Sequence, residues 1–255
     1  MSGFADLPAF EFGEPFSEGV ILRRRSQFTM DVELDGESRS FHCPTTGRIG
    51  SIDVAGRPCL VSLAHGVGRK TAGTVEALSL ARPGDEVKEW IGINQNAANR
   101  YVEHYLRCGG LAGVVGGEPG RRREDVCREV FLGGSRLDFL VGDTFLEVKT
   151  PLQHLQVDVP EWVAMKKATP FSSTSRMQRH VSELARSLDE HHKAVLLTCF
   201  MYDNPGFAII ERSTNYDAVK ATVDAGLTRG VEVWQANFRI APDHVRLERV
   251  MPVTF

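Results

Sequence analysis

The sequence predicts a two-domain protein in which a β-rich N-terminal domain precedes an α/β domain. Short strand candidates with turn residues between them fill the first third of the chain, and helix and strand patterns alternate after Pro83-Gly84. The 255 residues are 42% hydrophobic and 25% charged, which is globular composition with enough chain for two cores. We expect a tail over residues 1–15, a first domain over 16–84 and a second over 85–255.

The first domain is expected to be a small barrel or a sandwich. Turn signals such as Asp35-Gly36, Pro44 with Gly47 and Gly56 with Pro58 separate the strand candidates at roughly ten-residue spacing, which is typical of both architectures. The candidate strands cover residues 20–22, 28–34, 38–42 and 59–63.

The second domain is expected to follow the order αβββαβαβ. An apolar stripe at helical spacing predicts a helix over residues 95–107, which Gly109-Gly110 ends. The remaining expected strands cover residues 126–132, 135–141, 144–150, 194–201 and 231–236, and the remaining helices cover 176–189 and 216–229. This alternation is typical of an α/β domain.

Composition and termini narrow the class of protein. The net charge of −3 predicts no overall basic surface, so any phosphate-binding region must be local or helped by metal. The five cysteines are scattered, with no Cys-x-x-Cys pair, and they favour a reducing compartment over disulfides or a zinc site. Because the first residues lack a signal-peptide pattern and no apolar run is long enough to span a membrane, we expect a soluble cytoplasmic protein without a membrane partner.

The chemistry is concentrated in the predicted hairpin around Gly142-Asp143. If Val141 pairs with Thr144 across this two-residue turn, Asp138 faces Glu147. Side chains alternate along strands, so Asp138, Glu147 and Lys149 share one face of the ribbon. Two carboxylates beside a lysine match the PD-(D/E)xK pattern of two-metal nucleases.

Two further acidic residues could join the site. If Gly133-Gly134 is also a two-residue turn, Glu129 faces Asp138, and opposed like charges would be relieved by a divalent cation. Glu103 and Asn99 lie on one strip of the helix predicted over 95–107, from which Glu103 could lean into the site. We therefore consider Asp138, Glu147, Glu103 and Glu129 as ligands of Mg²⁺ or Mn²⁺.

This set suits phosphodiester hydrolysis, although a simpler interpretation exists. Carboxylate-held metal can activate water and neutralise charge, and Lys149 can orient the water or stabilise the transition state. A Glu-x-Lys strand can instead form only a surface ion pair, and Glu86-Val87-Lys88 has the same form without an acidic partner upstream. The Asp138 register and the apolar neighbours favour the metal site.

At these residues the chain resembles the sugar fermentation stimulation (SfsA) family. The segment Ser135-Arg136-Leu137-Asp138-Phe139-Leu140 with Glu147-Val148-Lys149 is similar to the family's S-R-x-D-F-L and E-V-K motifs. Further similar stretches begin at Leu22, His42, Arg69, Ile93 and Arg179. The chain departs from the family pattern at Thr45, Gln95, Met177 and over residues 160–175.

The resemblance implies an N-terminal OB-fold, a β-barrel, followed by a PD-(D/E)xK nuclease-like α/β domain with DNA binding and nuclease activity. We expect DNA or RNA as partner, and homodimerisation is a further option. Candidate nucleic-acid-binding residues are Arg23, Arg24, Arg25, Arg69, Lys70, Arg136, Arg176, Arg179 and His180. The alternative is that the arginines are solvated edge residues and that His180 lies on a helix surface.

Two functions follow from the sequence. The first is a metal-dependent nuclease that uses Asp138, Glu147 and Lys149 as catalytic residues. The second is a non-catalytic or weakly catalytic DNA-binding regulator, of sugar-metabolism genes, on the same fold. Lys149 beside two acids favours the nuclease, and nothing in the sequence indicates a sugar-metabolising enzyme.

Overall fold

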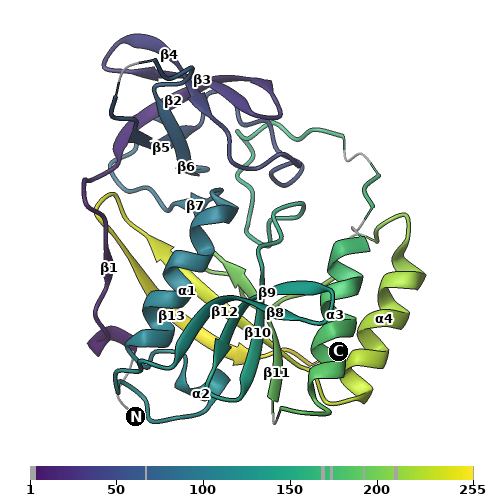
Figure 1. The fold of residues 1–255 in the computed structure, drawn as a ribbon. Helices are drawn as coiled ribbons and strands as arrows, with labels where there is room; N and C mark the ends of the chain where they lie inside the picture. The colour runs from purple at the N-terminus through teal and green to yellow at the C-terminus, as the bar shows by residue number, and fades with distance from the viewer. Residues whose placement is uncertain are drawn as a thin grey trace.

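The computed structural model describes residues 4–66, 68–167, 170–172, 175–191, 193–209 and 212–254. It contains a β-barrel and an α/β domain, drawn at the top and the bottom of Figure 1. Within the described ranges, no helix is both long and apolar enough to cross a membrane. The presence of the barrel and the α/β domain confirms the expected fold class, a β-rich part followed by an α/β part.

The N-terminal domain is a closed barrel rather than a sandwich. Its sheet has the order β4-β3-β2-β5-β6-β7, and a parallel contact between His42 of β4 and Thr74 of β6 closes it. The strands are β2 (Ser17–Ser26), β3 (Thr29–Leu34), β4 (Glu37–His42), β5 (Pro58–Leu63), β6 (Gly73–Leu78) and β7 (Ile91–Gly92). The expected strands match β2 to β5, and the structure adds β6 and β7.

Apolar side chains from both domains fill the barrel core. Ile21, Met30 and Phe41 are fully buried between the barrel strands. Phe200 and Tyr202, from the second domain, pack into the same cluster. The segment over residues 150–167 also contributes, so the barrel rests on the α/β domain through a shared core.

The second domain is built on a seven-stranded sheet with the order β1-β13-β12-β11-β10-β9-β8. The central strands β10, β11 and β12 are parallel, and antiparallel strands flank them. The strands are β1 (Phe10–Glu11), β8 (Val126–Leu132), β9 (Ser135–Val141), β10 (Thr144–Lys149), β11 (Lys193–Phe200), β12 (Glu232–Ile240) and β13 (His244–Pro252).

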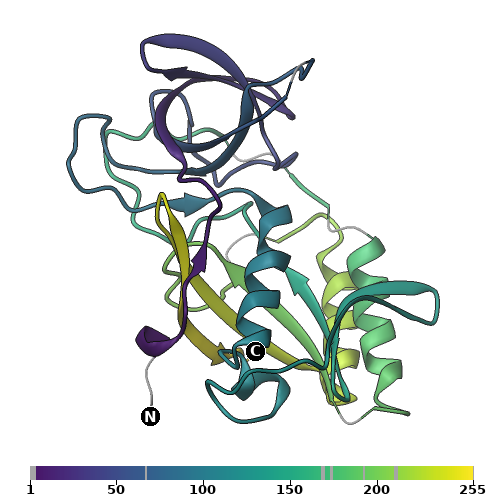
Figure 2. The same ribbon diagram turned by 60° about the vertical axis from the view of Figure 1, so that its left-hand side comes forward.

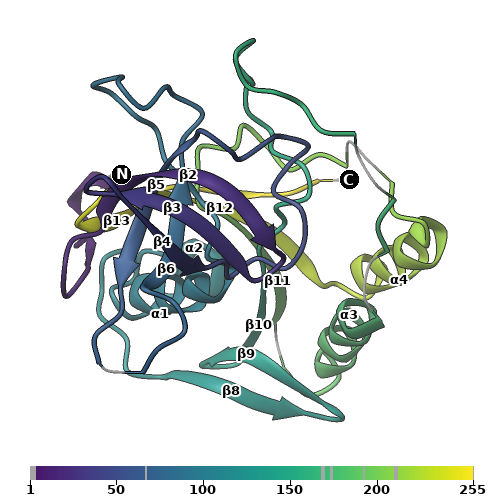
Figure 3. The same ribbon diagram turned by 90° about the horizontal axis from the view of Figure 1, so that it is seen from above.

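Helices cover both faces of this sheet, as Figure 3 shows from above. Helix α1 (Ala98–Arg107) packs on one face with the short α2 (Ala112–Val115). Helices α3 (Ser175–Ser187) and α4 (Tyr216–Thr228) contact each other, and α3 packs on the opposite face. Single 3-10 turns form at Phe4–Asp6 and Gln95–Ala97. The central strands are therefore buried on both sides, as parallel strands require.

The limits expected after residues 15 and 84 do not coincide with the limits that strand pairing gives. β7 joins the barrel sheet after residue 84, because Ile91 pairs with Leu78. The expected tail over residues 1–15 contains β1, which pairs with β13 in the other domain, as the left side of Figure 2 shows. Phe10 there packs against Tyr101 with ring centroids 5.2 Å apart. A two-residue strand gives no period-2 pattern, so only long-range pairing reveals it.

Candidate metal centre

The β9–β10 hairpin positions the predicted acidic pair. Gly142 has a φ of +56°, which suits a two-residue turn with glycine in its first position. Thr144 pairs with Val141 as expected, and the pairing continues to Leu146 with Phe139. Instead of a further Asp138–Glu147 pair, Oδ2 of Asp138 accepts a hydrogen bond from the backbone N–H of Val148 at 2.8 Å. The Asp138 carboxylate therefore takes the place of a β9 carbonyl.

This change corrects the expectation that all three residues share one face. Leu137 packs on the α3 side of the sheet, whereas Phe139 packs on the α1 side, so regular alternation is interrupted at Asp138. Oδ1 of Asp138 accepts a hydrogen bond of 2.7 Å from Nδ2 of Asn99 in α1. The Asp138 carboxylate thus connects the strand edge to α1.

Burial raises the pKa of Asp138 above its ordinary value, and the negative charge of Glu147 raises it further. The hydrogen bonds from Val148 and Asn99 and the positive charge of Lys149 oppose this increase. The net direction is upward, so ionising Asp138 costs more here than it does for an aspartate in water. A cation beside Asp138 would lower that cost.

Glu147 is almost completely buried, with 2% of the residue exposed. Its Oε1 accepts hydrogen bonds from Nζ of Lys149 and from Nδ1 of His180. Its Oε2 is buried and has no hydrogen-bond partner. An unpaired carboxylate oxygen away from water costs free energy, and a bound cation would offset that cost.

Lys149 is partly accessible to solvent, with 31% of its side chain exposed. Its Nζ also donates to the carbonyl oxygen of Val148 at 3.3 Å. Just beyond it, the carbonyl of Thr150 accepts a hydrogen bond from Gln95, at the start of the α1 region. Hydrogen bonds at Lys149 and Thr150 therefore hold the end of β10 in place, while the Lys149 ammonium stays accessible to solvent.

His180 belongs to this cluster, which the sequence did not predict. We expected it either on the surface of a helix or in contact with the backbone of a nucleic-acid substrate, but it is 3% exposed and contacts Glu147. Val181 and Leu184 share its buried side of α3. His180 and Leu184 are four residues apart, so they lie on the same side of the helix. A polar residue in an apolar helical stripe usually has a buried partner, and this pattern could have placed His180 in the interior from the sequence alone.

The other two expected ligands lie among arginines. Glu103 accepts hydrogen bonds from Arg107 and Arg128 at 3.0 to 3.1 Å. Glu129 is exposed, has a φ of +52° and pairs with Arg136 at 3.3 Å. The strand register around Glu129 is the expected one, yet its carboxylate is neutralised by an arginine rather than by a shared cation. Neither residue joins Asp138 and Glu147.

Within the described ranges, no three His, Cys, Asp or Glu side chains converge in a complete metal site. A cation at Asp138 and Glu147 would therefore need backbone, water or substrate oxygens as well. The Val148 carbonyl is one candidate, because the Lys149 ammonium donates to it as well as to Glu147. Hard cations such as Mg²⁺ accept such mixed oxygen ligands.

The expected nucleic-acid-binding arginines at residues 23–25 divide into two groups. Arg23 and Arg25 pair with the buried Asp31 at 2.8 and 2.6 Å but remain largely exposed. Arg24 points elsewhere and donates to the carbonyls of Gly47, Gln27 and Thr45. The strand alternates sides, so only two of the three are available at the surface. Arg69, Lys70, Arg176 and Arg179 are exposed.

Comparison with known proteins identifies the family. The family model described as "SfsA N-terminal OB domain" matches residues 22–93, and the one described as "Sugar fermentation stimulation protein RE domain" matches residues 96–244. The chain belongs to the sugar fermentation stimulation protein family. The two matches divide it between β7 and α1, and the barrel is its OB domain.

Members of this family resemble the chain over nearly its whole length. A homolog from Synechococcus elongatus is 32% identical over 248 residues, covering 94% of this chain and 95% of that protein. A homolog from Methylobacterium sp. (strain 4-46) is 30% identical over 257 residues, covering 97% and 99%. The structure of Pyrococcus furiosus SfsA in complex with Ca²⁺ has a TM-score of 0.70 at 20% identity and covers 97% of this chain and 99% of that one. This likeness confirms the two-domain fold.

Proposed function

We propose that the protein is a metal-dependent nuclease that hydrolyses phosphodiester bonds of DNA or RNA. The observation that carries the proposal is the buried, unpaired Oε2 of Glu147 beside Asp138, whose pKa is raised. A purely structural ion pair would leave no carboxylate oxygen without a partner. Perturbed acids of this kind are concentrated at functional sites.

The donor set fits a divalent cation with a preference for oxygen. Asp138, Glu147 and the carbonyl of Val148 would hold it, and Mg²⁺ or Mn²⁺ is the natural choice for such ligands. The Ca²⁺ complex of the Pyrococcus furiosus relative supports divalent binding at a fold of this kind. When bound, the cation lowers the pKa of a coordinated water and neutralises charge on the phosphate.

The surrounding residues orient these groups. Asn99 and the Val148 N–H each hold one oxygen of Asp138. His180 holds Oε1 of Glu147. Lys149 keeps its ammonium next to the same oxygen, where it can hold a water or donate to a phosphate oxygen as negative charge develops. Orientation by buried partners is what keeps the acids in one geometry.

The barrel would bind the nucleic-acid strand. The OB-domain match supports this role, because OB barrels commonly bind single strands through basic and aromatic surface residues. Arg23, Arg25, Arg69 and Lys70 are exposed on this domain and would contact phosphates. Arg136, Arg176 and Arg179 are exposed on the α/β domain and would extend the contact toward the metal centre.

Cleavage assays test the proposal. Purified protein is incubated with plasmid, single-stranded DNA and RNA in Mg²⁺, Mn²⁺ or EDTA. We expect cleavage only with a divalent metal, and a rate at least about 100-fold lower in Lys149→Ala and Asp138→Ala, since each removes a charge that acts in the transition state.

The chain offers a matched control for Lys149. Lys88 belongs to a second Glu-x-Lys sequence, and its Nζ pairs with Glu18 at 3.1 Å. Lys88→Ala should cleave at the wild-type rate. Equal cleavage in wild type, Lys149→Ala and Asp138→Ala would reject this site. Tight binding with no cleavage in any metal would instead support a DNA-binding regulator on the same fold.

A further inference from the structure

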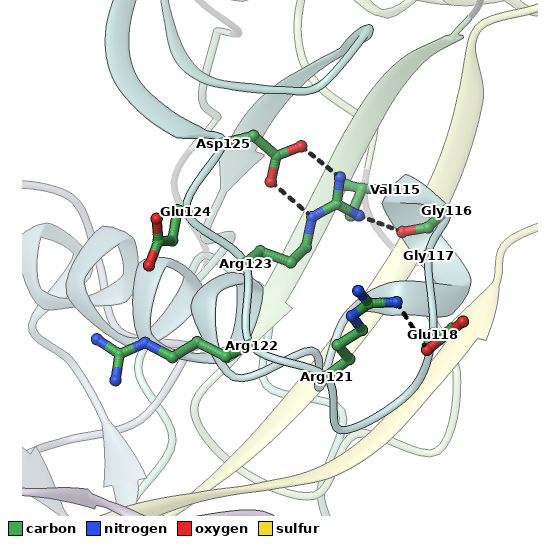
Figure 4. A pocket seen from close by; sticks show the side chains of 9 residues that line it. All are labelled: Val115, Gly116, Gly117, Glu118, Arg121, Arg122, Arg123, Glu124 and Asp125. Atoms are coloured by element: carbon green, nitrogen blue, oxygen red, sulfur yellow. Dashed lines mark hydrogen bonds and ion pairs between the residues drawn. The ribbon is translucent and has the colours of Figure 1, made fainter.

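The β8–β9 hairpin is held at its base by the loop over residues 115–125, which lines a cavity of about 620 Å³ (Figure 4). Arg123 pairs with Asp125 at 2.7 Å, directly before β8 begins, and also donates to the carbonyl of Gly116. The backbone N–H of Arg123 donates to the carbonyl of Arg107 in α1 at 2.8 Å. The start of β8 is therefore fixed beside α1, and the charges of Arg123 and Asp125 are satisfied within the loop.

Side chains of the inner half of this hairpin face α1. On β9, Phe139 and Val141 belong to the core on the α1 side of the sheet. On β8, Val126 belongs to the same core, and Arg128 pairs with Glu103 of α1 at 3.0 Å. These residues occupy alternate positions on each strand, as regular β-structure requires.

Side chains of the outer half of the hairpin face α3 instead. Val130 and Leu132 of β8 pack, together with Leu137 of β9, in the core on the α3 side of the sheet. Regular alternation would put all three on the α1 side, because each is an even number of residues away from one that faces α1. Both strands therefore change sides, β8 between Arg128 and Val130, and β9 between Leu137 and Phe139.

The change of sides occurs at a single cross-strand position. The register is the same before and after the change, and it places Glu129 opposite Asp138. Glu129 has a φ of +52°, in the left-handed region that residues with a Cβ rarely adopt. Within the described ranges, the other non-glycine residue with a positive φ is Asp35, in the turn between β3 and β4. A left-handed residue inside a strand re-aims the side chains around it, as at a β-bulge.

This change of sides decides where the Asp138 carboxylate lies. Regular alternation would place it on the α3 side with Glu147, so that two negative charges face each other. Instead, its Oδ1 accepts a hydrogen bond from Asn99 of α1 at 2.7 Å, and its Oδ2 accepts one from the N–H of Val148 at 2.8 Å. The pairing of β9 with β10 also stops one residue short of Asp138. The irregular position in the hairpin therefore coincides with the candidate metal centre.

We propose that the left-handed backbone of Glu129 positions Asp138 in the candidate metal centre. The outer half of the hairpin turns to pack on α3, and Glu129 supplies that turn directly opposite Asp138. The side chain of Glu129 contributes little, because its 3.3 Å pair with Arg136 joins two side chains that are each more than half exposed. Glu129 is therefore a positioning residue that acts through its main chain.

This inference rests on the proposed function for the role of Asp138 as a metal ligand, but its geometry is tested without metal. Glu129→Gly and Glu129→Val remove the same charge, and only valine, which is β-branched, resists a positive φ. Amide hydrogen exchange of the full chain is followed by NMR in EDTA. The probe is the N–H of Val148, which donates to Asp138 and is therefore protected. Asp138→Ala, which removes the acceptor, gives the unprotected rate.

We expect Glu129→Gly to keep the slow exchange of the Val148 N–H that wild type shows. Glu129→Val should exchange this proton about tenfold faster, because a left-handed conformation is costly for a residue with a Cβ. Amides of β12, away from the hairpin, are the reference for global stability and should change less. Mg²⁺ affinity should follow the same order, with Glu129→Gly close to wild type and Glu129→Val weaker.

Glu33 provides a matched control, because it is an exposed acid inside β3 without a positive φ. Glycine weakens an ordinary strand, so Glu33→Gly should have a lower Tm than Glu33→Val. The order should be reversed at residue 129. Arg136→Ala removes the partner of Glu129 but leaves its backbone unchanged, so the Val148 N–H should exchange as in wild type.

Equal exchange of the Val148 N–H in Glu129→Gly and Glu129→Val would overturn the proposal. Fast exchange in Arg136→Ala would also overturn it, because the ion pair would then position Asp138. If Glu129→Val does not fold, Glu129→Ala makes the same comparison with glycine. Failure of the proposed nuclease is seen separately, as a wild-type protein that protects the Val148 N–H but neither binds Mg²⁺ nor cleaves.

Discussion

Each domain buries a carboxylate next to positive side chains, and the two sites differ in how completely those acids are satisfied. In the barrel, Asp31 accepts hydrogen bonds from Arg23, Arg25 and Ser40 on its two oxygens. These contacts, the Arg23 hydrogen bond first, hold the pKa of Asp31 below its ordinary value despite burial. In the α/β domain, Glu147 keeps one oxygen unpaired.

The contrast separates a structural acid from a candidate ligand. The charge of Asp31 is stabilised by the fold itself, so another cation would add little there. The Asp138 and Glu147 pair lacks that compensation, since burial and mutual repulsion raise the pKa of Asp138. A fold that leaves buried negative charge incompletely paired has a place for a cation from solution.

The largest expected effect is the loss of the response to metal in Glu147→Gln. Mg²⁺ at 100 times its Kd should raise the free energy of unfolding of the wild type by about 2.7 kcal/mol, because it binds only the folded state. Glu147→Gln should lose that increase, and Asp31→Asn should keep it. Urea unfolding with Mg²⁺ and with EDTA measures both. An equal response in Glu147→Gln would mean that the metal binds elsewhere.

The second effect is a loss of stability in Asp31→Ala that is independent of metal. Removing this buried acceptor should lower the free energy of unfolding by about 2 kcal/mol, since Arg23, Arg25 and Ser40 lose a charged partner. The control is Glu37→Ala, which removes an exposed acid paired with Arg39 and should change stability by less than about 0.5 kcal/mol. Urea unfolding in EDTA compares them. Similar values for both would mean that the Asp31 cluster contributes no more than a surface pair.

The smallest expected effect is seen without metal: the contributions of Asp138 and Asp31 to stability should change with pH in opposite directions. The folded pKa of Asp138 is raised, so its contribution to stability is present below the ordinary value of 3.8 and is lost as pH rises through the folded pKa. The folded pKa of Asp31 is lowered, so its contribution is present above 3.8 and is lost as pH falls through the folded pKa.

Urea unfolding in EDTA from acid to neutral pH measures these two contributions. Relative to wild type, Asp138→Asn should be more stable at neutral pH than at low pH, by about 1.4 kcal/mol for each unit of pKa shift. Asp31→Asn should show the opposite trend. Parallel pH profiles for the two variants would contradict the opposed environments of these acids.

Much of the hairpin could be predicted from the sequence because its determinants are local. The expected strands over 126–132 and 135–141 coincide with β8 and β9, since glycine-containing turns and alternating residues fix both ends. The pairing of β1 with β13 could not be predicted, because its partners are far apart in sequence and the strand is two residues long. The same holds for β7, which extends the barrel sheet beyond residue 84.

The sequence by itself predicted the turn that keeps these residues near one another along the chain. A two-residue turn at Gly142 leaves Asp138 on β9 only a few residues from Glu147 and Lys149 on β10. The tertiary structure decided how their charges are satisfied. Asn99 reaches Asp138 from α1, and His180 reaches Glu147 from α3.

The tertiary structure also decided which acids were excluded from the candidate metal centre. Glu103 and Glu129 carry the same charge as the proposed ligands, yet each lies beside an arginine that neutralises it. Partners separated by many residues meet only when helices pack on the sheet, and that packing depends on the whole core. Residue type and register therefore gave the candidate ligands, whereas packing left one carboxylate oxygen, Oε2 of Glu147, without a partner.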